Sequence, residues 1–182
     1  MPEPFSAAKP PTRFYSWMYG SVIKFPPSGG SLCYRSPDAK AGQWPPAGAD
    51  KMIKLVRSAN GPEMFAAGAQ WSCTGFTVAP IICHCYTGRF GLDGYGRAFI
   101  PDAGLFSVLV VDGAGNPVLR FGDYGNADSA GPGSAIPAPG IPMSWPAAVS
   151  VGKGGVYVSD FISRRILRVD LVPSAEATCE VR

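Results

Sequence analysis

Charged residues are scarce in this chain. They make up 16% of its 182 residues, and the formal net charge at neutral pH is only +3. The basic residues are spread along the sequence, whereas a nucleic-acid-binding surface needs lysines and arginines gathered on one face. The local cluster at 164–168 alternates arginine with apolar residues, which is typical of the solvent side of a strand. The composition therefore argues against a nucleic-acid partner.

Long apolar runs and helix-length segments are missing as well. No stretch approaches the roughly 20 apolar residues that a membrane helix requires, and no basic segment followed by an apolar one, as in a secretion signal, opens the sequence. The 23 glycines and 19 prolines interrupt the chain every few residues. This pattern disfavours long helices and suits short strands joined by turns. Because 46% of the residues are hydrophobic, a core can still form, and we expect an all-β protein.

The sequence motifs of common enzyme classes are absent. His84 is the single histidine, and no Gly-x-Ser-x-Gly sequence accompanies it. The glycines of Gly91–Gly96 belong to a predicted hairpin turn that no helix follows, so they do not form a phosphate loop. A metal-dependent enzyme site would need several converging histidines or carboxylates, and the chain has one histidine. We therefore favour a protein without catalytic activity. If the chain is an enzyme, the sequence does not indicate which residues are catalytic.

The first half of the chain is hard to divide into elements. Residues 1–19 form an arm rich in proline and aromatic residues. Strands are predicted at 21–25 and 52–57 on either side of a proline-rich loop, as parts of an incomplete unit at about 20–62. Residues 63–89 are predicted to be irregular, with short strands at 76–78 and 81–82 that Pro80 separates.

A regular pattern begins at residue 90. A hairpin over 90–102, a strand over 106–112 and a strand over 117–121 make one four-stranded unit. The segment 106–111 is apolar on both faces, as expected of a strand between two neighbouring layers. Residues 122–144 are mostly Gly, Pro, Ala and Ser and are predicted to be a linker or surface loop outside the core.

The same unit then returns over residues 145–171, with a C-terminal strand expected in the remainder of the chain to 182. Its strands are predicted at 147–151, 155–160 and 165–170. Phe99, Asp102 and Asp112 have counterparts in Tyr157, Asp160 and Asp170, each 58 residues later. An aromatic residue and two aspartates at one constant offset indicate an internal repeat.

The second unit resembles an NHL repeat. Trp145-Pro146 stands at its beginning, Val156–Asp160 has the form Val-Tyr-Val-x-Asp, and Arg165-Ile166 follows a short loop. The first copy departs from this motif, because Leu105-Phe106 stands where Arg-Ile is usual, while 120–126 resembles the link between two blades. The resemblance implies blades of a β-propeller, in which the tyrosine is core and each aspartate closes a turn by accepting backbone N–H bonds. The residues that it assigns to blade structure are Asp102, Asp160, Tyr157, Arg165 and Trp145.

From about residue 17 onward the chain also resembles the C-terminal part of NHL-repeat proteins predicted from planctomycete-type bacterial genomes. The likeness is carried by Ile23–Gly30, Cys83–Asp93 and Glu176–Cys179. Such proteins are longer and exported, so the resemblance implies a bacterial protein of the periplasm or the cell exterior.

Two clear units and one incomplete unit are too few to close a propeller in one chain. An open unit exposes an apolar face and unpaired edges, which favours association. We therefore expect copies of the chain to complete a ring as a homo-oligomer. The expected function is a binding or scaffold module for protein or carbohydrate partners, which contacts them through the propeller face and through Trp17, Trp44 and Trp71.

The cysteines leave two alternatives open. Cys73, Cys83, His84 and Cys85 lie within 13 residues and are ligand types that zinc and copper accept. In an extended strand, however, Cys83 and Cys85 share a face that His84 does not. The alternative is a disulfide from Cys73 to Cys83 or Cys85, which an exported protein favours. A metal site here would support the alternative function of a metal-dependent or hydrolytic enzyme. The five cysteines are an odd number, so at least one thiol is free.

Overall fold

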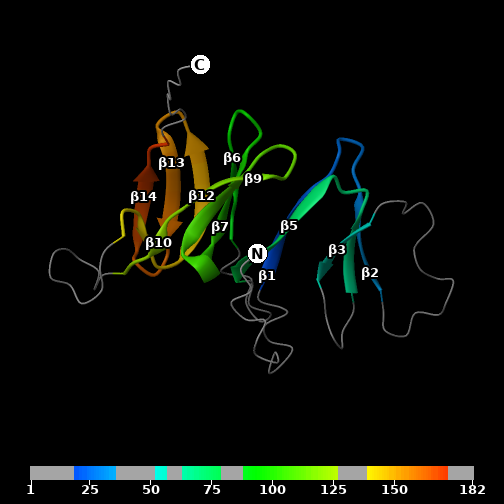
Figure 1. Ribbon diagram of the computed structural model, residues 1–182, viewed down its shortest axis with the longest axis horizontal. Helices are drawn as coiled ribbons and strands as arrows, with labels where there is room; N and C mark the ends of the chain where they lie inside the picture. The colour runs from blue at the N-terminus through cyan, green and yellow to red at the C-terminus, as the bar shows by residue number, and fades with distance from the viewer. Residues whose placement is uncertain (1–18, 36–51, 57–62, 79–87, 127–138, 172–182) are drawn as a thin grey trace, which may run out of the picture.

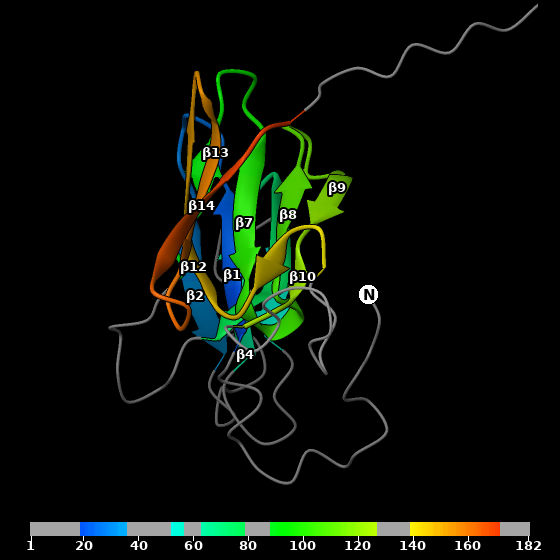
Figure 2. The ribbon, with the colours of Figure 1, turned by 90° about the vertical axis from the view of Figure 1, so that its left-hand side faces the viewer.

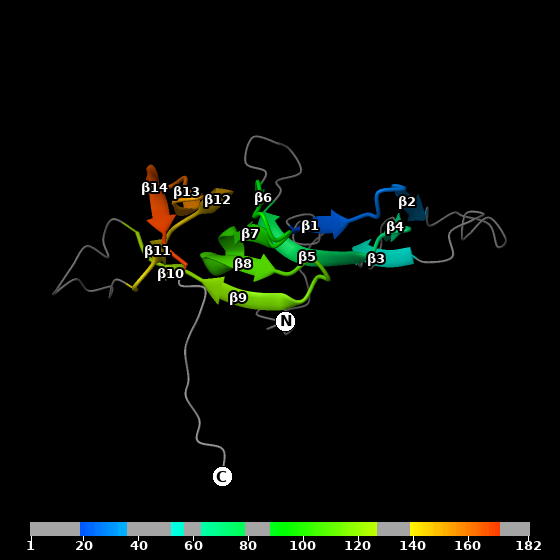
Figure 3. The same cartoon turned by 90° about the horizontal axis from the view of Figure 1, so that it is seen from above.

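The computed structural model describes residues 19–35, 52–56, 63–78, 88–126 and 139–171. These residues form strands and one short 3-10 turn, with no α-helix among them, so the all-β prediction is confirmed. The strands build several small open sheets that lie in a row (Figure 1). Figure 3 shows this row from above. The C-terminal sheet lies at one end, and the sheet of β2 (Ser31–Arg35), β3 (Met52–Val56) and β4 (Glu63–Ala67) lies at the other. A search of the described residues finds no helix with the length and apolar character needed to cross a membrane.

The central sheet is the four-stranded unit that the sequence predicts at 90–121. It contains β6 (Gly91–Leu92), β7 (Ala98–Asp102), β8 (Ser107–Val111) and β9 (Pro117–Phe121), all antiparallel and in chain order. Every residue of β8 is buried, as is every residue of β7. The prediction of a strand covered on both faces is therefore confirmed.

The two faces of the central sheet belong to two different hydrophobic clusters. Phe99, Val108 and Val110 pack with the valines of the C-terminal sheet. On the opposite face, a second cluster includes Val22 and Trp71 of the N-terminal strands. The residues that the central sheet contributes to this second cluster are Ala98, Ile100, Leu109 and Val111. Period-two alternation along β7 and β8 separates the two sets.

The C-terminal sheet contains β12 (Pro146–Gly152), β13 (Gly155–Asp160) and β14 (Arg165–Val169). Figure 2 looks along the row from this end and shows this sheet nearest the viewer, with the central sheet behind it. The inner edges of the two sheets also join, because the backbone of Arg89 accepts a hydrogen bond from Val149 N at 2.8 Å and donates one to Ala147 O at 2.9 Å.

The internal repeat is visible in the backbone of these two sheets. β7 and β8 pair with Ala98 opposite Val111, and β13 and β14 pair with Val156 opposite Val169, 58 residues further on. Two non-glycine residues of the described part have left-handed φ angles, Phe106 at 52° and Arg164 at 49°, again 58 residues apart. The repeat that the sequence predicts is thus visible in two strands of each sheet, β7-β8 and β13-β14. The fourth strand expected between 171 and 182 lies outside the described residues.

The segment 122–144 is not simply a loop outside the core. Its described ends form β10 (Asp123–Tyr124) and β11 (Pro142–Met143), which pair in parallel. Met143 is fully buried in the cluster between the central and C-terminal sheets. The prediction for this segment is therefore wrong at its ends, because Met143 is buried in the core and Ile141 packs against the same cluster.

The N-terminal strands form a bent two-stranded ribbon. β1 (Tyr19–Lys24) pairs with β5 (Trp71–Val78), and β2 (Ser31–Arg35) pairs with β4 (Glu63–Ala67). β3 (Met52–Val56) adds to the other side of β4. The strands predicted near 21–25 and 52–57 are present but belong to different sheets. The prediction that 63–89 is irregular is wrong for 63–78, which forms two full strands.

Candidate functional site

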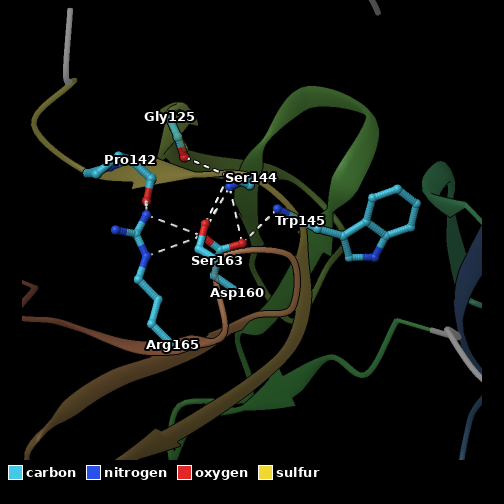
Figure 4. Close-up of polar contacts among 7 residues, drawn as sticks. All are labelled: Gly125, Pro142, Ser144, Trp145, Asp160, Ser163 and Arg165. Atoms are coloured by element: carbon cyan, nitrogen blue, oxygen red, sulfur yellow. Dashed lines mark hydrogen bonds and ion pairs between the residues drawn. The ribbon is translucent and has the colours of Figure 1, made fainter. Parts of the chain in front are cut away.

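A buried polar cluster surrounds Asp160 at the end of β13 (Figure 4). The side chain of Asp160 is 0% exposed. Its Oδ1 accepts a hydrogen bond from the backbone N–H of Trp145 at 2.8 Å, and both of its oxygens lie within 3.2 Å of the backbone N of Ser144. The guanidinium of Arg165 donates to Oδ2 from Nη2 at 3.2 Å and from Nε at 3.3 Å.

The neighbours of Asp160 are bonded to one another. Ser163 Oγ donates to Ser144 Oγ at 2.9 Å, and Ser144 Oγ donates to the carbonyl of Gly125 at 2.8 Å. Arg165 Nη2 also donates to the carbonyl of Pro142 at 2.7 Å. Within the described residues, every buried side-chain nitrogen or oxygen has a hydrogen-bond partner. The cluster therefore acts as a clamp that holds the connecting segment against the C-terminal sheet.

The clamp differs from the turn closure that the sequence predicts. Asp160 does accept two backbone N–H groups, but they belong to residues 15 and 16 positions earlier in the chain and not to the local turn. Trp145 takes part through its backbone N–H, while its half-buried ring is not needed for the clamp. Such long-range acceptance joins two distant segments, which a local turn bond cannot do.

Asp102, the counterpart of Asp160, is held in another way. Its Oδ2 accepts a hydrogen bond from Arg120 Nη1 of β9 at 2.8 Å, and the same Nη1 donates to Ser107 Oγ at 2.7 Å. Ser107 stands at the position that Arg165 has in the second unit. In the first unit the guanidinium that bonds the aspartate therefore comes from Arg120 on the neighbouring strand. The residues that align with Arg165-Ile166 are therefore Ser107-Val108. The alignment made from the sequence, with Leu105-Phe106 at these positions, is wrong.

Tyr157 does not lie in the core, although the resemblance assigns it there. It points to the outer face of the C-terminal sheet and is 38% exposed, whereas its counterpart Phe99 is 0% exposed. Ile166, which pairs with Ser159 on the same face, is 74% exposed. Large side chains occupy these positions in both units, but in the second unit no described part of the chain covers them.

Two turns at one end of the central sheet share a five-residue design, Asp93–Arg97 and Asp112–Asn116. In each turn the aspartate Oδ1 accepts backbone N–H bonds from the second and fourth residues that follow it. Burial alone would raise the pKa of Asp93, but the hydrogen bonds from Arg97 and Tyr95 outweigh it and place that pKa below its usual range. The hydrogen bonds from Asn116 likewise lower the pKa of Asp112.

The two turns differ in what covers them. Trp71 Nε1 donates to the carbonyl of Gly113 at 3.1 Å, and the ammonium of Lys24 donates to the same oxygen. Trp71, predicted as a partner-binding residue, therefore anchors a turn within the molecule. The other turn is open: Tyr95 is 86% exposed, and the Arg97 guanidinium lies 5.3 Å from the centre of its ring. We call the exposed side chains of Phe90, Leu92 and Tyr95 the hairpin surface.

The predicted metal ligands are mostly outside the described part of the chain. Cys83, His84 and Cys85 lie there, as do Trp17, Trp44 and Cys179. Cys73 lies on β5 beside the second hydrophobic cluster, and burial raises the pKa of its thiol. Cys33 and Cys73 are both free thiols, and no group of three or more metal-binding side chains occurs among the residues that the structure describes.

Comparison with known proteins gives no matching family model and no matching curated sequence. The likeness to NHL repeats therefore rests on the residues of this chain. It enters only the proposal that follows.

Proposed function

We propose that this chain is a non-catalytic binding and scaffold module built from NHL-type β-propeller blades, with proteins or carbohydrates as its partners. The observation that carries the proposal is the display of large apolar and aromatic side chains on rigid backbone. The carboxylates that the repeat singles out are already engaged in hydrogen bonds: Asp102 bonds Arg120 within the central sheet, and Asp160 bonds the backbone of the connecting segment. Export from a bacterial cell and completion of the propeller by further copies belong to the same proposal.

The hairpin surface is the best candidate for an external ligand. The carboxylate of Asp93 fixes the turn through bonds of 2.9 Å from the backbone N–H groups of Tyr95 and Arg97. Gly96 has a φ of 76°, which a glycine adopts without strain. Because the backbone is already ordered, binding to Tyr95 loses little conformational entropy.

The chemistry of Tyr95 suits the two partner classes. A tyrosine offers an apolar ring face for stacking and a hydroxyl for hydrogen bonding, and such residues are enriched at binding hot spots. The guanidinium of Arg97 beside the ring supplies further donors, and its ion pair with Asp93 at 2.6 Å fixes its position. A sugar ring or a shallow protein surface can contact this arrangement without any cavity.

The proposal is tested by binding of the labelled chain to a glycan array and by cross-linking to exported proteins, followed by affinity measurement on each ligand found. Tyr95→Ser should lower the affinity for such a ligand by about tenfold or more, which is the loss typical of an aromatic hot spot. Val118→Ser, which removes an exposed side chain of β9 outside the hairpin surface, is the control and should leave the affinity unchanged. Absence of any ligand, or equal affinities for Tyr95→Ser and the unaltered chain, would count against the proposal.

A further inference from the structure

The sheets of this chain stack with one constant polarity. Phe99, Val108 and Val110 of the central sheet are covered by the sheet that follows in the chain. The opposite face of the central sheet rests on strands that precede it, through contacts with Val22 and Trp71. The junction between the two repeat units therefore joins the front of the first to the back of the second, and the back of the first unit faces the strands that precede it.

The repeat identifies the front of the last sheet. A shift of 58 residues carries Phe99, Val108 and Val110 to Tyr157, Ile166 and Arg168, in the same strand register. In the central sheet these positions are completely buried, but in the C-terminal sheet all three are exposed. Phe161 and Ile162, in the turn between β13 and β14, are exposed beside them. We call these five residues the terminal face.

The terminal face keeps large apolar side chains. Terminal units of stacked repeat proteins usually carry a polar outer face, yet Ile166 is the most exposed large aliphatic side chain of the described residues. Arg168 is the one charged residue of the face, and Asp170 pairs with it at 3.0 Å. Because this pair neutralises the charge locally, covering the face costs less desolvation than an unpaired arginine would.

We propose that the terminal face is covered by the N-terminal β2-β4-β3 sheet of a second copy of this chain, head to tail. That sheet lies at the other end of the row (Figure 3), and Leu32 on its outer strand β2 is 56% exposed. A front-to-back contact between copies continues the stacking polarity that the chain already uses. It is heterologous, so the copies form a closed ring or an open chain. The inference deepens the proposed function by naming the two surfaces through which copies assemble, and it rests only on that assembly and not on ligand binding at the hairpin surface.

Paired charge variants test the contact. Ile166→Glu alters the terminal face and Leu32→Glu alters the opposite end, while Leu92→Glu places the same charge on an equally exposed residue of the hairpin surface. In sedimentation velocity the unaltered chain and Leu92→Glu should associate above 19.1 kDa. Ile166→Glu and Leu32→Glu should each raise the dissociation constant by at least about tenfold. An equimolar mixture of those two variants should form heterodimers, because one intact end remains on each.

Three results would overturn the inference: a mass of 19.1 kDa for the unaltered chain at every concentration, normal association of Leu32→Glu, or an equal loss in Leu92→Glu. Normal association of Leu32→Glu with loss in Ile166→Glu would show a face-to-face dimer instead. Thermal unfolding of each variant checks that it folds, and Tyr157→Arg replaces Ile166→Glu if the latter unfolds early. Tyr95→Ser should associate normally, so failure of this contact and failure of ligand binding at the hairpin surface are distinguished.

Discussion

Replacing Asp160 by alanine should cause a large loss of stability. The substitution leaves the backbone N–H of Ser144 without an acceptor in a fully buried position, and that of Trp145 in a partly buried one. An unpaired buried donor costs about 1–3 kcal/mol, so the two together should cost about 2–6 kcal/mol. Arg165 adds little to this loss, because its side chain is 35% exposed and keeps its bond to the carbonyl of Pro142.

A second aspartate of the same sheet provides the matched control. Asp170 pairs with Arg168, but both side chains are more than half exposed, so Asp170→Ala should cost less than about 1 kcal/mol. Urea unfolding followed by tryptophan fluorescence measures both variants, provided that the slope against urea concentration is unchanged. If Asp160→Ala loses no more stability than Asp170→Ala, the clamp does not hold the sheet as described.

Two further predictions concern the paired turns. A Cβ at Gly115, where φ is 90°, would lie 2.6 Å from Cγ of Trp71, so Gly115→Ala should destabilise by about 1–3 kcal/mol in urea unfolding. Gly94→Ala in the open turn, where a Cβ meets no atom within 4 Å, should cost less than about 1 kcal/mol. For Asp93, the folded-state pKa lies below the unfolded value of about 3.9. Its contribution to stability is therefore present above about pH 4 and lost as the pH falls through the folded-state pKa. Asp93→Asn should remove this part of the acid dependence, and an unchanged profile would contradict it.

The sequence predicts the fold best where its signals are local. The hairpin at 90–102 and the apolar strand β8 depend on alternation and turn residues that lie within a few positions of one another. The repeat makes the second unit recognisable in the same way, through Tyr157 and Asp160. The strands β4 and β5 carry weaker signals. Residues 66–69 are alanine and glycine, and the partners of β5 on β1 lie 47–59 positions away while those of β4 on β2 lie 28–36 positions away.

The candidate site is harder to predict for a different reason. A repeat motif shows that Tyr157 and Phe99 occupy equivalent positions, but it does not show which of them a neighbouring sheet covers. The hydrogen bonds of Asp160 could not be predicted either, because their backbone donors belong to a segment that the sequence indicates as a loop. Arg120 compensates for the missing arginine of the first unit from another strand, which motif alignment alone does not reveal. For Tyr95, the sequence indicates a position in a turn but no role in binding.

Hydrogen exchange along the chain tests the central claim, that the sheets stack front to back and leave the terminal face open. In dilute solution we expect the amides of β8, covered on both faces, to exchange slowest and those of β14 to exchange much faster. Raising the protein concentration should then protect β13 and β14, while the turn at 93–97 remains unchanged. Equal protection of β8 and β14 in dilute solution, or no response of β14 to concentration, would contradict the account.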